Sequence, residues 1–193
     1  MSAPNPPRAA LPSVRLAPLP AERWDDDVDS ALSGMLPRWR RNPENAGNAL
    51  ATLVHHPALV TAFLPLNVHL LFSSTLSPRL RELAILRIAH RRGSDYEWAH
   101  HVDMGRRTGL TDDDIAGAAD GSAAGFDGVV LRAVDELHDA SRISDETWAA
   151  LGEQFDDRQR IDLIFTVGTY STLATAFNTF GVQLDHDHDG NEG

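Results

Sequence analysis

The sequence predicts an all-α protein, and three observations support that prediction. Apolar residues recur at helical spacing in most of the chain, as Phe126, Val130 and Val134 do. Strong helix start signals, such as Ser77 followed by Pro78, stand before these runs. No stretch alternates apolar and polar residues between hairpin turns, as strands would. The length of 193 residues favours a single domain with a sizeable core.

The first predicted helices are short and bounded by prolines. One is expected over residues 24–35, and a second runs from Pro43 towards His55. Pro57 then lies in the first turn of an apolar helix. Pro65 is expected to kink that helix or split it in two, because proline lacks the amide hydrogen that a helix needs.

The middle of the chain has sharper boundaries. The helix that begins after Ser77 is expected to end at Gly93. The next helix begins at Ser94 and runs to about Thr108, where Gly109 closes it. Three further helices are each preceded by a capping pattern, at Thr111 with Asp114, at Ser144, and at Asp156 with Gln159. The last helix is long, from Arg160 towards Val182.

The two ends of the chain differ from the rest in composition. Residues 1–20 contain six prolines, which predicts an extended arm, either disordered or lying on a neighbouring subunit. Residues 185–193 read DHDHDGNEG and are expected to be disordered. Residues 21–184 would then form the helical domain, with its motif core at 77–121.

Composition excludes several classes of function. The chain has no cysteine, which rules out disulfides, thiolate metal sites and a cysteine nucleophile. Its net charge of -11 predicts a surface that repels nucleic acids and anionic membranes. No apolar run is long enough to span a membrane, and the N-terminus lacks the apolar stretch of a signal peptide. We therefore expect a cytoplasmic protein.

The most informative constellation lies on the two helices that meet at Gly93. Glu97 and His101 are one turn apart and share a helix face, and Glu82 stands on the preceding helix. A carboxylate beside an imidazole can move protons near neutral pH, which predicts a Glu–His relay. Two alternatives remain open. Ser94 and Glu97 also fit a capping box, and Glu82 could be an exposed carboxylate paired with Arg79 or Arg81.

Other polar and aromatic side chains are candidates for lining a pocket around His101. Those expected to bind substrate are Ser94, His69, Tyr96, Trp98 and His100, and Tyr170 and Asn178 on the last helix are further candidates. His69 lies within an apolar helix, so we expect it to be buried and to need a partner such as Glu82 or Glu97.

The same region resembles the carboxymuconolactone decarboxylase and AhpD-like superfamily, in its stretches RELAILRIA and YEWAHH and in the turn at 109–111. The likeness runs from about residue 45 to 180. Glu82 and His101 fall at the family's Glu and His positions, whereas Ser94 and Glu97 stand where the redox members have their two cysteines. The resemblance implies an AhpD-like helical bundle that forms dimers, trimers or hexamers. The lack of cysteine excludes the thiol peroxidase activity of the redox members.

Together these observations predict a carboxymuconolactone decarboxylase-like lyase, decarboxylase or isomerase that acts on a small organic acid or lactone without a cofactor. His101 would be the general acid and base, with Glu97 and Glu82 as its partners. One alternative is a non-catalytic binding or scaffold protein of the same fold. Another is a metal-dependent enzyme, because Glu97 and His100 form a Glu-x-x-His motif with an imperfect counterpart at residues 135–138. No metal, nucleic-acid or membrane partner is expected.

Overall fold

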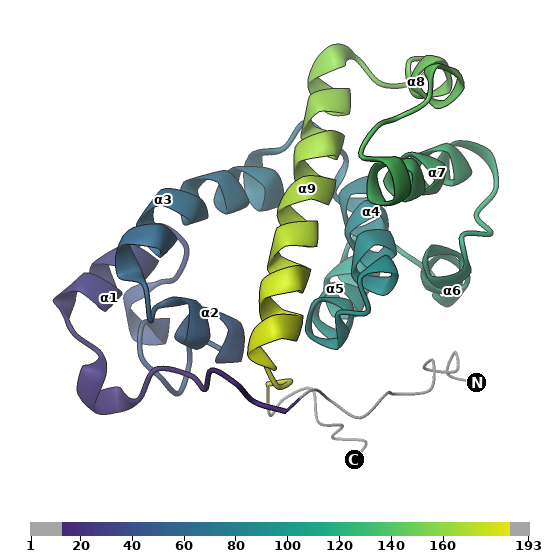
Figure 1. Ribbon diagram of the computed structural model, residues 1–193. Coiled ribbons are helices and arrows are strands. Elements are labelled where there is room, and N and C mark those ends of the chain that lie inside the picture. Colours follow the sequence, from purple (N-terminus) through teal and green to yellow (C-terminus); the bar gives the residue numbers. More distant parts are fainter. Residues whose placement is uncertain (1–12, 186–193) are drawn as a thin grey trace. The chain divides into compact units, whose positions relative to one another are not determined.

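The computed structural model describes residues 13–185, and these residues form helices and loops without any strand (Figure 1). The predicted all-α class is therefore confirmed. The predictions for residues 1–12 and 186–193 concern segments outside the described residues. Contacts divide the described chain into two compact units, residues 74–176 and residues 13–73 with 177–185.

The smaller unit, residues 13–73 with 177–185, is built from short helices around an apolar core. Its helices are α1 (Asp26–Leu32), α2 (Asn48–Leu53) and α3 (Pro57–Val68), with 3-10 turns η1 (Ala21–Arg23) and η2 (Arg38–Arg40). Both α1 and α2 are shorter than expected. Helix α1 begins only after Asp25, whose side chain caps it by accepting a hydrogen bond from the Val28 amide. Helix α2 begins only after Gly47, because the φ of 82° at that glycine is not helical.

Helix α3 (Pro57–Val68) is not interrupted at Pro65, contrary to the prediction. The helix continues through Pro65 and neither ends nor divides there. The bonding pattern changes only at His69, where the π-helical turn η3 (His69–Ser73) begins. A π turn accommodates one extra residue in the helical ladder, so the irregularity expected at the proline lies one turn beyond it.

Part of the proline-rich arm lies against its own chain. The amides of Arg15 and Leu16 donate to the Phe180 carbonyl at 2.8 and 3.1 Å, and the Leu19 amide donates to the Ala51 carbonyl at 2.7 Å. Leu19 is only 3% exposed. The described part of the arm therefore belongs to the smaller unit.

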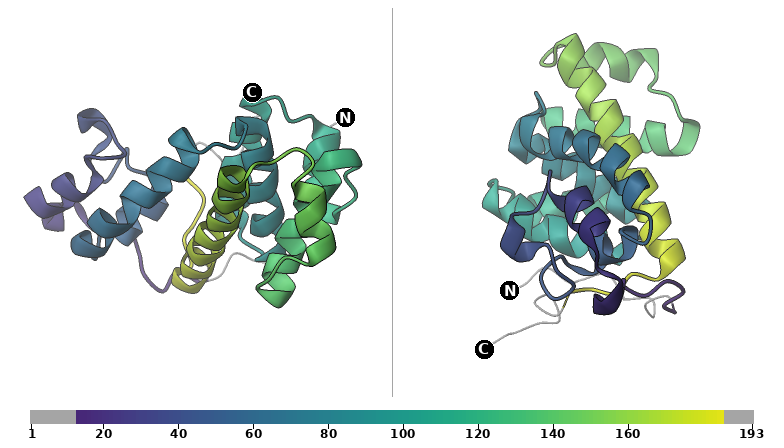
Figure 2. Two further views of the ribbon diagram at one scale, coloured as in Figure 1. Left: turned by 90° about the horizontal axis from the view of Figure 1, so that it is seen from above. Right: turned by 90° about the vertical axis from the view of Figure 1, so that its left-hand side faces the viewer.

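The larger unit, residues 74–176, has α4 (Pro78–Arg91) at its centre (Figure 1). Around α4 pack α5 (Asp95–Arg107), α6 (Asp112–Asp120) and α7 (Gly125–Ala140), and α8 (Asp145–Leu151) packs on α7. Every residue from 81 to 89 is buried, so α4 is covered on all sides. The long helix α9 (Asp157–Phe180), green to yellow in Figure 2, contributes residues 157–176 to this unit.

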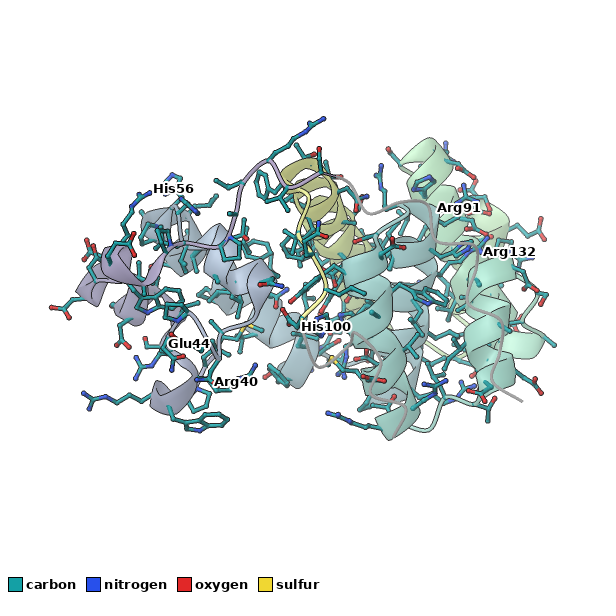
Figure 3. All side chains as sticks on the ribbon, turned by 90° about the horizontal axis from the view of Figure 1, so that it is seen from below. Arg40, Glu44, His56, Arg91, His100 and Arg132 are labelled. Carbon is teal, nitrogen blue, oxygen red and sulfur yellow. The ribbon has the colours of Figure 1, made fainter. Side chains whose placement is uncertain are left out.

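Arginines on α4 attach it to its neighbours through ion pairs. Arg87 pairs with Asp135 of α7 at 2.8 Å and also donates to the Ala119 carbonyl at the end of α6. Arg91, labelled in Figure 3, pairs with Asp135 as well, at 3.4 Å. The bonds of Arg87 satisfy its buried guanidinium group, which would otherwise be costly to bury.

Most predicted helix boundaries are confirmed. Side-chain caps form at Ser77 and Ser144, and complete capping boxes form at Thr111 with Asp114 and at Asp156 with Gln159. Gly93 and Gly109 take positive φ values of 58° and 96° between helices. Among residues 13–185, no helix is both long and apolar enough to cross a membrane.

Candidate functional site

Three of the predicted site residues come together inside the larger unit. Glu82 lies on α4, and Glu97 and His101 lie one turn apart on α5, which packs against α4 after the turn at Gly93. All three are buried, with exposed fractions of 0%, 5% and 4%. Their proximity is therefore a structural fact, and their catalytic role stays a prediction.

The imidazole of His101 lies between the two carboxylates. Its Nδ1 is 2.6 Å from Oε2 of Glu82, and its Nε2 is 3.3 Å from Oε2 of Glu97. A carboxylate can only accept from such a nitrogen, so an imidazole that bonds both carboxylates carries a proton on each nitrogen. The geometry therefore favours the charged imidazolium.

Electrostatics agree with that assignment. Burial by itself lowers the pKa of His101, but the hydrogen bonds to Glu82 and Glu97 and their negative charges outweigh it and raise the pKa from 6.5 to about 9. At neutral pH His101 is thus a proton donor, and it becomes a base only after it has given a proton away.

Arg81 completes the site, and its role was not predicted. Its Nε and Nη2 atoms donate to Oε1 of Glu82 at 3.0 and 2.9 Å, in a pair that is almost entirely buried. Burial raises the pKa of Glu82, but the bonds from His101 and Arg81 more than compensate and hold that pKa below its usual value. The sequence indicated a nearby arginine only for an exposed Glu82, because adjacent helical residues do not normally face each other.

The capping box expected at the start of α5 does not form. Ser94 is the N-cap residue, but its side chain makes no capping bond among the described residues, and its hydroxyl is buried there without a hydrogen-bond partner. Glu97 faces His101 instead of turning back to the Ser94 amide, which donates to the Ala89 carbonyl. Attraction to the imidazolium explains why the carboxylate prefers this direction.

Tyr170 on α9 also contacts His101. The two rings meet edge to face, with centroids 4.8 Å apart and planes at 89°. Tyr170 is buried, so its ring closes one side of the imidazole. Sequence spacing alone gave little indication of this contact, because it joins two helices far apart in the chain.

The other candidates are found in ring contacts on α5 or in the smaller unit. Tyr96 and His100 pack ring against ring at 4.3 Å along α5. Trp98 meets the His90 ring edge to face and packs against the apolar core of α4, α6 and α7. His69 is exposed in η3 of the smaller unit, so the expectation that it is buried is wrong. Asn178 also lies in the smaller unit.

The geometry does not favour the metal alternative. Among residues 13–185, no group of three or more His, Asp or Glu side chains is arranged to hold a metal ion. Asp135 of the second motif is paired with Arg87, and Glu136 accepts from the Ser144 amide and the Thr147 hydroxyl, both at 2.7 Å. A protonated His101 has no lone pair to offer a metal.

The four side chains Arg81, Glu82, Glu97 and His101 form a cluster whose charges balance and which holds an exchangeable proton. Arg81 and His101 carry two positive charges, and Glu82 and Glu97 carry two negative ones, all in a dry environment where unpaired charges are expensive. Such a cluster can donate one proton to a substrate and later accept one, without any change in its backbone.

Comparisons with known proteins agree with the fold. A family described as the carboxymuconolactone decarboxylase family matches residues 57–139, which include Glu82, Glu97 and His101. No curated protein matches the sequence. The predicted resemblance is therefore confirmed for this segment.

Several solved structures share the fold at low sequence identity, and the first of them below is described as an alkylhydroperoxidase AhpD core. An uncharacterised peroxidase-related protein from Ralstonia eutropha JMP134 superposes with a TM-score of 0.73 at 16% identity, over 90% of this chain and 94% of that one. Another from Silicibacter sp. TM1040 gives 0.67 at 16% identity over 98% of both chains. The debrominase Bmp8, as a variant bound to 2,3,4-tribromopyrrole, gives 0.65 at 16% identity over 90% of this chain and 92% of its own.

Proposed function

We propose that this chain, whose residues 57–139 match the carboxymuconolactone decarboxylase family, is an acid–base catalyst of that family, a lyase or isomerase that needs no cofactor. The observation that supports this proposal best is the imidazole of His101, bonded at both nitrogens by buried carboxylates. Because the chain has no cysteine, a thiol mechanism is excluded.

The proposed reaction uses Glu97 and His101 in turn. Loss of carbon dioxide from a small unsaturated acid or lactone leaves an electron pair on the substrate as an enolate, and that carbon needs a proton. Glu97 delivers it after taking one from Nε2 of His101, and solvent later restores the proton. For an isomerisation, Glu97 removes the proton from one carbon and the same pair returns it at another.

A direct assay tests the proposal. Carboxymuconolactone and related unsaturated lactone acids would be incubated with the protein, while ultraviolet absorbance and carbon dioxide release are followed. For a substrate that turns over, His101→Gln and Glu97→Gln should each lower kcat by about 10²–10⁴-fold. His90→Gln, an exposed histidine of α4, is the matched control and should keep full activity. Full activity in His101→Gln would disprove the assignment.

A second candidate is a non-catalytic binding or scaffold protein, and one observation favours it. The four charges of the cluster satisfy one another and are almost fully buried, which is also how a purely structural network looks. On this reading Glu97→Gln would lower the free energy of unfolding, and no member of the substrate series would be consumed. On the catalytic reading Glu97→Gln would mainly lower the rate.

Self-association and location remain part of the proposal. The resemblance implies a homo-oligomer, and exposed large apolar side chains on α9, Ile161 and Phe165, are compatible with a covered surface. Native mass spectrometry of untagged protein would give the number of subunits, and a monomer at micromolar concentration would contradict it. The cytoplasmic location expected from the sequence would be tested by fractionation.

A further inference from the structure

We propose that Arg81 is a positioning residue that keeps Glu82 ionised, so that the mobile proton of His101 leaves only through Nε2 towards Glu97. The inference rests on the proposed acid–base function, and it assigns different tasks to two carboxylates that the sequence does not distinguish. Glu82 would be a fixed anion and Glu97 the carboxylate that exchanges protons.

The two oxygens of Glu82 are divided between two partners. Oε1 accepts both bonds from Arg81, at 3.0 and 2.9 Å, and Oε2 lies 2.6 Å from Nδ1 of His101. Glu97, in contrast, makes its ion pair only with His101, at 3.3 Å, among the pairs of the described chain. A guanidinium bonded through two nitrogens stabilises a carboxylate as the anion and opposes its protonation.

The bonds from Arg81 to Glu82 explain why the proton of His101 does not move to its nearer carboxylate, Glu82. The bond to Glu82 is shorter than the bond to Glu97, so without Arg81 the proton of His101 would be drawn towards the wrong carboxylate. Glu82 is 0% exposed on a helix that is covered on all sides, so a proton placed there would not reach a substrate. Arg81 makes that transfer unfavourable, since it would leave a buried guanidinium without a counter-charge.

The proton count is simple. The N–H bond at Nε2 of His101 breaks, an O–H bond forms on Glu97, and the imidazole becomes neutral. The reverse transfer restores the starting state. No electrons are exchanged and no other reactant is needed.

The charged side chains on the other helices around α4 form their bonds with residues other than Glu82. Those on α6 and α7 pair with other arginines of α4 or with local groups: Asp114 and Asp127 with Arg79, Asp120 with the Ser122 amide, and Asp135 and Asp139 with Arg91. On α9, Asp162 accepts from Thr75, and Tyr170 contributes its ring to His101. Arg81 and His101 are therefore the charged groups that stabilise Glu82 as the anion.

The test is a carbon-13 NMR titration of the glutamate carboxyl groups, in the substrate-free full chain. In Arg81→Met, the titration midpoint of Glu82 should rise by about one to three pH units. In Arg81→Lys, which keeps the charge but loses the planar two-nitrogen bond, the midpoint should rise by less than in Arg81→Met. Arg87→Met removes another buried arginine of the same helix and should leave the Glu82 midpoint unchanged.

Two results would overturn the inference: an unchanged Glu82 midpoint in Arg81→Met, or an equal rise in Arg87→Met. If Arg81→Met does not fold, Arg81→Gln is titrated instead and the same criteria apply. Because no substrate is present, the outcome is independent of whether the protein is an enzyme. With a substrate in hand, the acid limb of kcat against pH should move with the NMR midpoint in the Arg81 variants only.

Discussion

His101 shows how a buried histidine can remain charged at neutral pH. An isolated imidazole buried to this extent would lose its proton, but two carboxylates hold the pKa at about 9. The same pairing links the charge of one residue to the stability of the fold, because the unfolded chain has the ordinary pKa of 6.5.

A pH-dependent contribution to stability follows from this difference. Because the folded pKa is raised, the contribution is fully present below pH 6.5 and is lost as the pH rises through about 9. Urea unfolding of the original protein and of His101→Gln at pH 6, 8 and 10 would measure it. The gap between them should be largest at pH 6 and shrink by roughly 3 kcal/mol by pH 10. A constant gap would contradict the charged imidazolium.

The site illustrates what sequence can and cannot supply at this scale. Helical spacing correctly brought Glu97 and His101 onto one face, and the turn at Gly93 correctly brought Glu82 near them. A pairing of Arg81 with Glu82 was considered only for an exposed carboxylate, and the sequence did not indicate that both side chains are buried. The unpaired hydroxyl of Ser94 was missed for a similar reason, since a serine at a helix start normally caps it.

At the scale of the helix, the two serine or threonine caps on either side of α5 should respond differently to mutation. Thr111→Ala removes a complete capping box from α6 and should cost about 1 kcal/mol of unfolding free energy. Ser94→Ala removes a buried hydroxyl that caps nothing among the described residues, so stability should stay equal or rise slightly. Thermal unfolding of both variants checks this, and a larger loss in Ser94→Ala would show a bond that the structure lacks.

The sequence predicted helix starts correctly where a side chain caps the helix. Caps at Ser77, Ser144 and Asp156 set three starts correctly. The errors fell where weak signals compete: α2 is short because Gly47 takes a positive φ, and α3 passes through Pro65. An apolar helix gains enough from burial to keep its direction past one missing hydrogen bond.

At the scale of the whole molecule, one glycine is important for the contacts of the N-terminal arm. The smaller unit needs a glycine where the arm crosses the end of α9. Gly181 has a φ of 72°, and a Cβ at this position would lie 2.3 Å from the Ser13 carbonyl oxygen. Any other residue would meet both backbone strain and a steric clash.

Gly181→Ala should therefore loosen the arm by about 1–3 kcal/mol. Hydrogen exchange measured by mass spectrometry should show faster exchange at the amides of Arg15, Leu16 and Leu19, which the arm contacts protect. Gly34→Ala is the matched control, because its Cβ would meet nothing within 4 Å and its φ is not positive. Equal exchange in both variants would mean that the arm is not held at this point.

The contacts of the N-terminal arm with the smaller unit also decide where the protein can be truncated for laboratory work. Proline content suggests removing residues 1–20 before crystallisation or fusion to a tag, yet Leu19 fills the core of the smaller unit. A chain that starts at Ala21 should unfold about 2 kcal/mol more easily than one that starts at Ser13, through the loss of that leucine alone. A trimming series followed by thermal unfolding would show the drop between these two starts, and tags are better attached ahead of Ser13.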